Sequence, residues 1–388
     1  MLRAASLIGL FALAGTGTCA TRKLLLGDAE RGREVFETHS CVTCHGVNGQ
    51  GGRIGPDLAQ MVDRGFTPYR FAALLWNHAP AMFTKLDRMG IARPELTPQQ
   101  AADLFAYLFA LRSFEQPGNA RRGKRVFRSM NCAQCHAGND SLGPGVAPVP
   151  TWPPLDHPFL LALRMWNHPP TSLPRASGQP APPLPHLTAQ DLADLLVYLR
   201  SVQGRRRNVT LLPGSPAQGG QLFGTKGCSS CHYGSDALEG RPTRYTLNDF
   251  AAAMWNHLRP TPLQRVPINA AEMRLLAGYL LSIQFIAERG DAGRGSLLFE
   301  KKRCVACHEH PSGQTPGRSD MAGRMTSFDM AAALWKHGPA MRETMRRKNI
   351  PWPRLDGDDM ADLTAYLHGY EFKRRTLSAT PAAPPPIR

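Results

Sequence analysis

The chain has 388 residues, of which 42% are hydrophobic and 20% charged, so it is long enough for several domains and too apolar to be disordered throughout. Lysine and arginine number 46 against 30 aspartate and glutamate, a net charge of +16. No element typical of nucleic-acid recognition accompanies this charge, so we expect no nucleic-acid partner. After the first twenty residues no apolar run approaches the roughly 18 residues that cross a bilayer, which excludes a polytopic membrane protein.

Residues 1–20 have the pattern of an export signal peptide. Arg3 gives a short basic start, an apolar stretch runs from Ala4 to Ala14, and small residues allow cleavage after Ala20. We therefore expect the mature protein in the periplasm or on the extracytoplasmic face of the membrane. Cys19 leaves a lipid anchor as the less favoured alternative, because the residues before it match a lipoprotein signal poorly.

The rest of the chain is an internal repeat of four units, at residues 27–116, 117–204, 213–287 and 289–373. Each unit is predicted to begin with a helix whose capping residue follows a glycine. A second glycine and, one turn later, a phenylalanine share one face of this helix, which predicts close packing on another helix. Unit by unit, the cap, glycine and phenylalanine are Asp28, Gly32 and Phe36; Asn119, Gly123 and Phe127; Ser215, Gly219 and Phe223; and Asp291, Gly295 and Phe299.

Two further helices are predicted in each unit. A middle helix ends in tryptophan and histidine, and a proline within the next three residues should end or kink it there. A closing helix carries Leu-x-x-Tyr-Leu, an apolar stripe that should pack on the glycine and phenylalanine face. The middle helices are expected at 71–78, 159–168, 250–257 and 328–337, and the prolines are Pro80, Pro169, Pro260 and Pro339. The four tryptophans are expected in the core or in the wall of a pocket. Strand signals are nearly absent, which predicts an all-α fold, and the proline-rich tail 374–388 is expected to be disordered.

Each unit also contains Cys-x-x-Cys-His between its first two helices. One planar group can bridge two cysteines at this spacing, and the next histidine can then bind a metal at the centre of that plane. This is the pattern of haem attached by two thioethers, with the histidine as a proximal iron ligand. A zinc site would need more ligands together, and a redox dithiol needs no histidine. We therefore expect four covalently attached haem c groups. The attachment cysteines are Cys41, Cys44, Cys132, Cys135, Cys228, Cys231, Cys304 and Cys307, and the proximal histidines are His45, His136, His232 and His308.

Through the Gly-x-x-[Val/Leu]-Phe segment, the Cys-x-x-Cys-His motif and the closing Leu-x-x-Tyr-Leu, each unit resembles a class I cytochrome c domain. The resemblance covers residues 27–373. It implies four tandem domains, each of about three helices plus loops around one covalently bound haem. It also implies a loop proline whose carbonyl holds the proximal histidine. The candidates are Pro56, Pro144, Pro242 and Pro316.

The sixth, distal iron ligand is left open. The family normally supplies a methionine after the middle helix, and Met82 and Met341 stand there in units 1 and 4, but Ser172 and Thr261 replace it in units 2 and 3. All four units share a histidine at the end of the middle helix, which we expect as the distal ligand. These distal candidates are His78, His168, His257 and His337. The alternative is Met82 and Met341 in units 1 and 4, with bis-histidine or five-coordinate iron in units 2 and 3.

These features predict an exported tetrahaem c-type cytochrome that carries electrons between redox partners of a respiratory or similar chain, including a membrane-bound oxidoreductase. Nothing in the chain resembles a separate substrate site, so an electron-transfer protein is favoured over an enzyme. Basic clusters at 121–125, 301–303 and 346–348 favour partners with acidic docking faces. Two alternatives are a peroxidase-like multihaem oxidoreductase with an open haem position and an electron-conducting subunit of a larger complex or filament.

Overall fold

The computed structural model describes residues 26–59, 65–113, 118–136, 147–155, 158–167, 185–204, 212–239, 246–257, 266–285, 290–309, 311, 313, 315–321, 323 and 325–378. Almost all of its regular structure is helical, which confirms the all-α prediction; β1 (Gly46–Val47) and β2 (Gln50–Gly51) form a short antiparallel pair. The predicted signal peptide and Cys19 lie outside the described residues. Within the described residues, no helix is both long and apolar enough to span a membrane.

The repeat of the sequence is a repeat of helices. Unit 1 contains α1 (Ala29–Thr38), α2 (Cys41–Cys44), α3 (Pro68–Met89) and α4 (Pro98–Ser113). Unit 2 contains α5 (Ala120–Ser129), α6 (Ala133–His136), the 3₁₀ turn η1 (Val149–Thr151), α7 (Pro158–Trp166) and α8 (Ala189–Val202). Unit 3 contains α9 (Pro216–Thr225), η3 (Cys228–Ser230), η4 (Gly234–Asp236), α10 (Leu247–Asn256) and α11 (Ala270–Ile283). Unit 4 contains α12 (Ala292–Lys301), α13 (Val305–His308), α14 (Arg318–Met321), α15 (Ser327–Arg347) and α16 (Gly357–Ser378).

The first and closing helices of every unit cross at the predicted glycine. A Cβ atom at Gly32 would lie 1.9 Å from the carbonyl oxygen of Asp103, and the same atom at Gly219 would lie 2.0 Å from that of Leu275. The phenylalanine one turn later packs on the closing tyrosine, with ring centroids 5.7 Å apart for Phe36 and 5.4 Å apart for Phe223. The predicted helix crossing is therefore confirmed, in unit 3 as in the others.

An arginine–aspartate pair, which sequence analysis missed, ties the same two helices together in units 1, 2 and 4. In unit 2, Arg122 Nε lies 2.7 Å from Asp194 Oδ2, and the backbone N–H of Asn119 donates to Asp194 Oδ1 at 2.6 Å. Burial alone would raise the pKa of Asp194, but these hydrogen bonds outweigh it and leave the pKa below its usual range. The pairs in units 1 and 4 are Arg31–Asp103 and Arg294–Asp362, whereas unit 3 has Gln218 and Leu275 at these positions.

Of the two predicted outcomes, an end of the middle helix just past its histidine is wrong in units 1 and 4. α3 continues through Pro80 to Met89, and α15 continues through Pro339 to Arg347. Pro80 has no N–H for the carbonyl of Trp76, one turn earlier, but that oxygen accepts a hydrogen bond from Trp352 Nε1 at 3.1 Å. The missing N–H of Pro80 therefore does not leave the Trp76 carbonyl without a hydrogen bond. In units 2 and 3, α7 ends at Trp166 and α10 at Asn256, and Pro169 and Pro260 lie outside the described residues.

The predicted disorder of the segment 374–388 is wrong for its first residues. α16 runs to Ser378, so its last turns include the start of the segment 374–388. Arginine and leucine in this segment favour helix, and the first proline is Pro381, which restrains only the residues near it. Residues 379–388 lie outside the described part of the chain.

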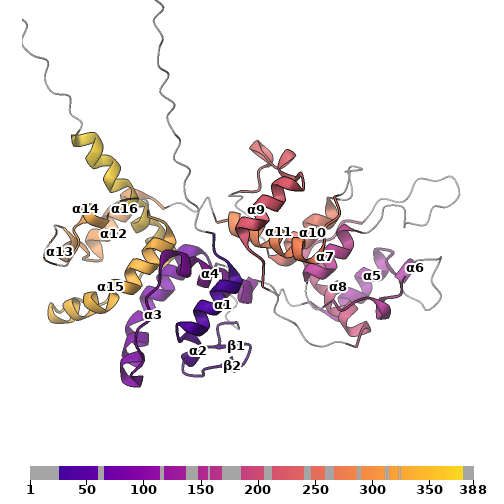
Figure 1. Cartoon of the computed structure of the whole chain (residues 1–388), viewed down its shortest axis with the longest axis horizontal. Helices are drawn as coiled ribbons and strands as arrows, with labels where there is room; N and C mark the ends of the chain where they lie inside the picture. Colours follow the sequence, from indigo (N-terminus) through magenta and orange to yellow (C-terminus); the bar gives the residue numbers. More distant parts are fainter. Residues whose placement is uncertain are drawn as a thin grey trace, which may run out of the picture.

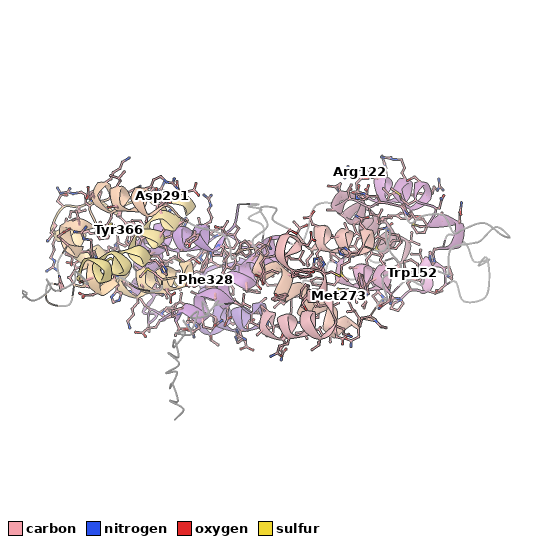
Figure 2. All side chains as sticks on the ribbon, turned by 90° about the horizontal axis from the view of Figure 1, so that it is seen from above. Arg122, Trp152, Met273, Asp291, Phe328 and Tyr366 are labelled. Atoms are coloured by element: carbon pink, nitrogen blue, oxygen red, sulfur yellow. The ribbon has the colours of Figure 1, made fainter. Side chains whose placement is uncertain are left out.

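The four units form two lobes, and the chain leaves the first lobe and returns to it (Figure 1). Units 1 and 4 make one lobe, in which α3 packs on α15, and units 2 and 3 make the other, in which α7 packs on α10. Figure 2 shows the lobes end to end, with Asp291 and Tyr366 in one and Arg122 and Trp152 in the other. Units distant in the sequence are therefore neighbours in space.

Candidate functional site

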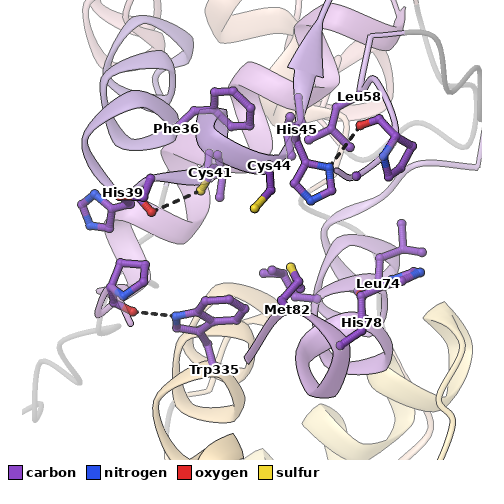
Figure 3. Close-up of a pocket in the computed structure, with 18 of the residues that line it drawn as sticks. Phe36, His39, Cys41, Cys44, His45, Leu58, Leu74, His78, Met82 and Trp335 are labelled. Carbon is purple, nitrogen blue, oxygen red and sulfur yellow. Dashed lines mark hydrogen bonds between the residues drawn. The ribbon is translucent and has the colours of Figure 1, made fainter. Parts of the chain in front are cut away.

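An apolar pocket in unit 1 brings together the residues that the sequence predicted for haem (Figure 3). Cys41, Cys44 and His45 line one side of it, and His78 and Met82, from α3, line the other. Most of the remaining wall is apolar. It comprises Phe36, Ile54, Leu58, Phe66, Phe71, Leu74, Leu75, Ala81, Leu86, Leu96, Leu104 and Leu108. Such a pocket fits a large flat apolar group that is tied at one edge and bound at its centre.

The proximal histidine of unit 1 is held in place from two sides. His45 Nδ1 donates a hydrogen bond to the carbonyl oxygen of Pro56 at 3.1 Å, which leaves Nε2 to bind iron. A Cβ atom at Gly55 would lie 2.4 Å from the His45 ring, so only glycine leaves room for the ring in this orientation. The contact with Pro56 confirms the loop-proline prediction in this unit.

The other proximal histidines use the same ring nitrogen. In unit 4, His308 Nδ1 donates to the Pro316 carbonyl at 2.8 Å, as predicted. In unit 2, His136 Nδ1 donates instead to the Ala147 carbonyl at 3.0 Å, and in unit 3, His232 Nδ1 donates to that of Asp236 at 3.3 Å. Pro144 and Pro242, the prolines predicted for these two units, lie outside the described residues. Any backbone carbonyl can accept this bond, so the path of the loop decides which residue supplies it, not the presence of proline.

The first cysteine of the motif in units 1, 3 and 4 lacks the lowered pKa of a redox dithiol. Burial raises the pKa of Cys41 and of Cys304 to about 11, and it also raises the pKa of Cys228. Redox-active Cys-x-x-Cys pairs need the opposite, a lowered pKa that supplies thiolate. The described cysteines form no disulfide, and no three His, Cys, Asp or Glu among the described residues gather into a metal-binding group. The side chain of Cys135 lies outside the described part.

The two distal candidates of unit 1 lie at different depths in the pocket. His78 is exposed, and its Nδ1 donates to the Leu74 carbonyl at 2.8 Å. Met82 is half-buried one turn later, and Figure 3 shows its sulfur facing the side of the pocket that holds His45, with His78 beside Leu74 at the edge. Both residues therefore reach the pocket, but Met82 lies further inside.

In unit 3, the ring centroids of His232 and His257 lie 5.6 Å apart. Like His78, His257 donates a hydrogen bond from Nδ1 to the carbonyl one turn earlier, which is that of Ala253 at 3.0 Å. The structure thus brings the proximal and distal candidates of this unit close together, with their rings tilted by 47°. In unit 4, His337 is exposed and Met341 is half-buried, whereas His168 of unit 2 lies outside the described residues.

One residue of the unit 1 pocket comes from another unit. Trp335, from α15 of unit 4, lines the pocket and donates its indole N–H to the carbonyl of Pro94 at 2.7 Å (Figure 3). The sequence predicted this tryptophan in the core or a pocket wall, but it gave no sign that the pocket would belong to unit 1. Only the folded chain brings residues 94 and 335 together.

Comparison with known families decides the identity of the fold. The cytochrome c family model matches residues 29–112, 120–203 and 292–370, together well over half of the chain. The chain belongs to the cytochrome c family. It is therefore a multihaem electron-transfer cytochrome with covalently bound haem c. The matched segments lie in units 1, 2 and 4, and no curated protein or solved structure matches the chain significantly.

Replacing Gly55 with alanine should change the spectrum of the unit 1 haem selectively. The added methyl group would collide with the His45 ring, so the ring must rotate or lose its hydrogen bond to Pro56. Electron paramagnetic resonance (EPR) of the oxidised cytochrome should show altered g-values for one haem, since ligand orientation sets them. Ala81→Gly, on the opposite wall of the same pocket, is the control and should leave that signal in place; an unchanged spectrum for Gly55→Ala would contradict the tight fit.

Proposed function

We propose that this cytochrome is exported, carries four haem c groups and passes electrons between redox partners of a respiratory or similar chain. When bound, each haem supplies an iron that gains and loses one electron. The chain attaches it through the paired cysteines, holds its iron through the proximal histidine and keeps water from it with the apolar wall. The observation that carries the proposal is the recurrence of one arrangement of helices and Cys-x-x-Cys-His in all four units.

Unit 3 is the decisive case for a count of four, because it lies outside the matched segments. It has the Gly219 crossing, the contact between Phe223 and Tyr279, and His232 directly after Cys-x-x-Cys. It lacks the arginine–aspartate pair of the other units, but that pair ties helices together and does not line the haem pocket of unit 1. The helix crossing and the attachment motif that unit 3 shares with the other units therefore support a haem in this unit.

We propose a mixed set of distal ligands. The inner position of Met82, and the equivalent place of Met341, support methionine in units 1 and 4. The proximity of the His232 and His257 rings supports bis-histidine iron in unit 3, and the shared sequence position extends this to His168 in unit 2. Methionine ligation raises the reduction potential relative to bis-histidine ligation, so the four haems would fall into a higher and a lower pair.

The basic surface supports partners with acidic docking faces. On α5, Arg121, Lys124 and Arg125 are exposed on a helix that ends close to the Cys-x-x-Cys-His of unit 2. Positive charge beside an electron-exit site would steer an acidic partner toward it. Reduction of such a partner should therefore slow as ionic strength rises.

A redox titration of the purified full chain, followed by absorption and EPR, tests the carrier function. We expect four one-electron centres, and little carbon monoxide bound by the reduced protein, since four six-coordinate irons leave no open position. Strong carbon monoxide binding by the unmodified protein would favour the peroxidase-like alternative. Fewer than four centres would overturn the proposed count.

A further inference from the structure

Trp76 and Asn77, in the interior of α3 of unit 1, bind the backbone of unit 4. Trp76 Nε1 donates to the Pro353 carbonyl at 2.8 Å. Asn77 binds both backbone groups of Leu355: its Nδ2 donates to the carbonyl at 2.7 Å, and its Oδ1 accepts from the N–H at 3.0 Å. The Trp76 ring also stacks on that of Trp352, with centroids 3.8 Å apart. The Trp-Asn of unit 1 thus forms a contact between units.

The tryptophan hydrogen bond between units is reciprocal, and it recurs in the second lobe. Trp335 Nε1 of unit 4 donates to the Pro94 carbonyl of unit 1. Pro94 has the same position in unit 1 as Pro353 in unit 4. In units 2 and 3, Trp166 Nε1 donates to the Val266 carbonyl at 3.1 Å and Trp255 Nε1 to that of Pro185 at 2.8 Å. Asn167 Nδ2 donates to the Ile268 carbonyl at 2.7 Å and Asn256 Nδ2 to that of Leu187 at 2.8 Å. Each lobe is therefore a pair of units related by matching contacts.

One of these contacts between units lies in the wall of the unit 1 pocket. Trp335 is almost completely buried, packs on Phe83 of α3 with ring centroids 5.0 Å apart, and lines the pocket that holds His45. Pro94, which accepts its hydrogen bond, lines the same pocket. Trp335 belongs to α15, whose own half-buried Met341 is the distal candidate of unit 4. One helix therefore contributes to the surroundings of both haem sites in this lobe.

We propose that the haem sites work as two coupled pairs, unit 1 with unit 4 and unit 2 with unit 3, and that the middle-helix tryptophans are the positioning residues that join the paired pockets. Within a pair one electron passes between the two irons, so that one is oxidised as the other is reduced, and no proton or atom moves. The inference rests on the proposed function, because it needs a haem in every unit. This pairing differs from a relay that passes electrons from unit 1 to unit 4 in sequence order, because units 1 and 4 share a lobe.

Trp335→Phe in the full haem-loaded chain tests the pairing. The change removes the hydrogen bond to Pro94 and reshapes the wall of the unit 1 pocket, although the substitution lies in unit 4. We expect the EPR signal and reduction potential of haem 1, identified by Gly55→Ala, to shift while those of haems 2 and 3 stay unchanged. Trp255→Phe, which removes the equivalent bond in the other lobe, is the matched control and should leave haem 1 unchanged.

The outcomes separate this inference from the proposed function. Mass spectrometry first establishes the number of haems, and fewer than four would overturn the proposed function. With four haems present, a haem 1 signal that Trp335→Phe leaves unchanged would overturn the pairing alone. Should the variant fail to fold, pulsed EPR of the unmodified protein decides: two short iron–iron distances support two pairs, and three comparable short distances, as in a linear relay, contradict them.

Discussion

Gly219→Ala should destabilise unit 3 by about 1–3 kcal/mol, because the new methyl group must displace either α9 or the backbone of α11. A Cβ atom there would lie 2.0 Å from the Leu275 carbonyl oxygen, and backbone cannot move aside as a flexible side chain can. Hydrogen exchange of the α9 and α11 amides in the full chain measures the local free energy of opening without assuming that four units unfold together.

Gly224 on the same helix supplies the control for this prediction. A Cβ atom at Gly224 would meet nothing within 4 Å, so Gly224→Ala should stabilise α9 by about 0.5–1 kcal/mol through its better helix propensity. Opposite signs for the two substitutions would support the crossing of α9 and α11. Equal effects would show that α9 does not pack on α11 at Gly219.

Met82→Ala should lower the reduction potential of haem 1 and allow the reduced protein to bind about one carbon monoxide per chain, because the variant would lose the thioether that we propose as the sixth ligand and that would raise the potential. Absorption spectra recorded during a redox titration, and again after addition of carbon monoxide, measure both effects. The expected change concerns one haem of the four, since Met82 lines only the pocket of its own unit among those described.

His78→Ala is the matched variant, one helical turn from Met82 on α3. Because the His78 ring is exposed at the edge of the pocket, we expect neither a fall in potential nor carbon monoxide binding. The reverse pattern, with His78→Ala opening the iron and Met82→Ala leaving it closed, would establish histidine as the distal ligand of unit 1. The shared histidine of the repeat would then be the ligand in every unit.

The elements of each unit could be predicted because their signals are local. Glycine, phenylalanine and the cysteine motif lie within one short stretch, so their spacing predicts the first helix and the haem attachment. The caps of the closing helices are local contacts too: Thr97 Oγ1 accepts from the N–H of Gln100 at 3.2 Å, and Thr188 forms a full capping box with Asp191. Such contacts join residues three positions apart and are therefore visible in the sequence.

The features that could not be predicted join residues far apart in the chain. Trp76 and Pro353 are separated by 277 positions, and no local pattern indicates which unit a tryptophan will contact. The course of α3 through Pro80 has the same origin, because Trp352 of unit 4 supplies the hydrogen bond that proline cannot. The buried aspartates Asp103, Asp194 and Asp362 do recur beside the closing leucine, and that repetition was the available sign of the arginine–aspartate pairs.

The mass of the purified, denatured chain tests the central claim most directly. Thioether-bound haem survives denaturation, so the account predicts a coloured polypeptide whose mass equals that of residues 21–388 plus four haems, with peptides containing Cys228 and Cys231 among those that carry one. A colourless chain, or a mass with no haem on the peptide of unit 3, would contradict it.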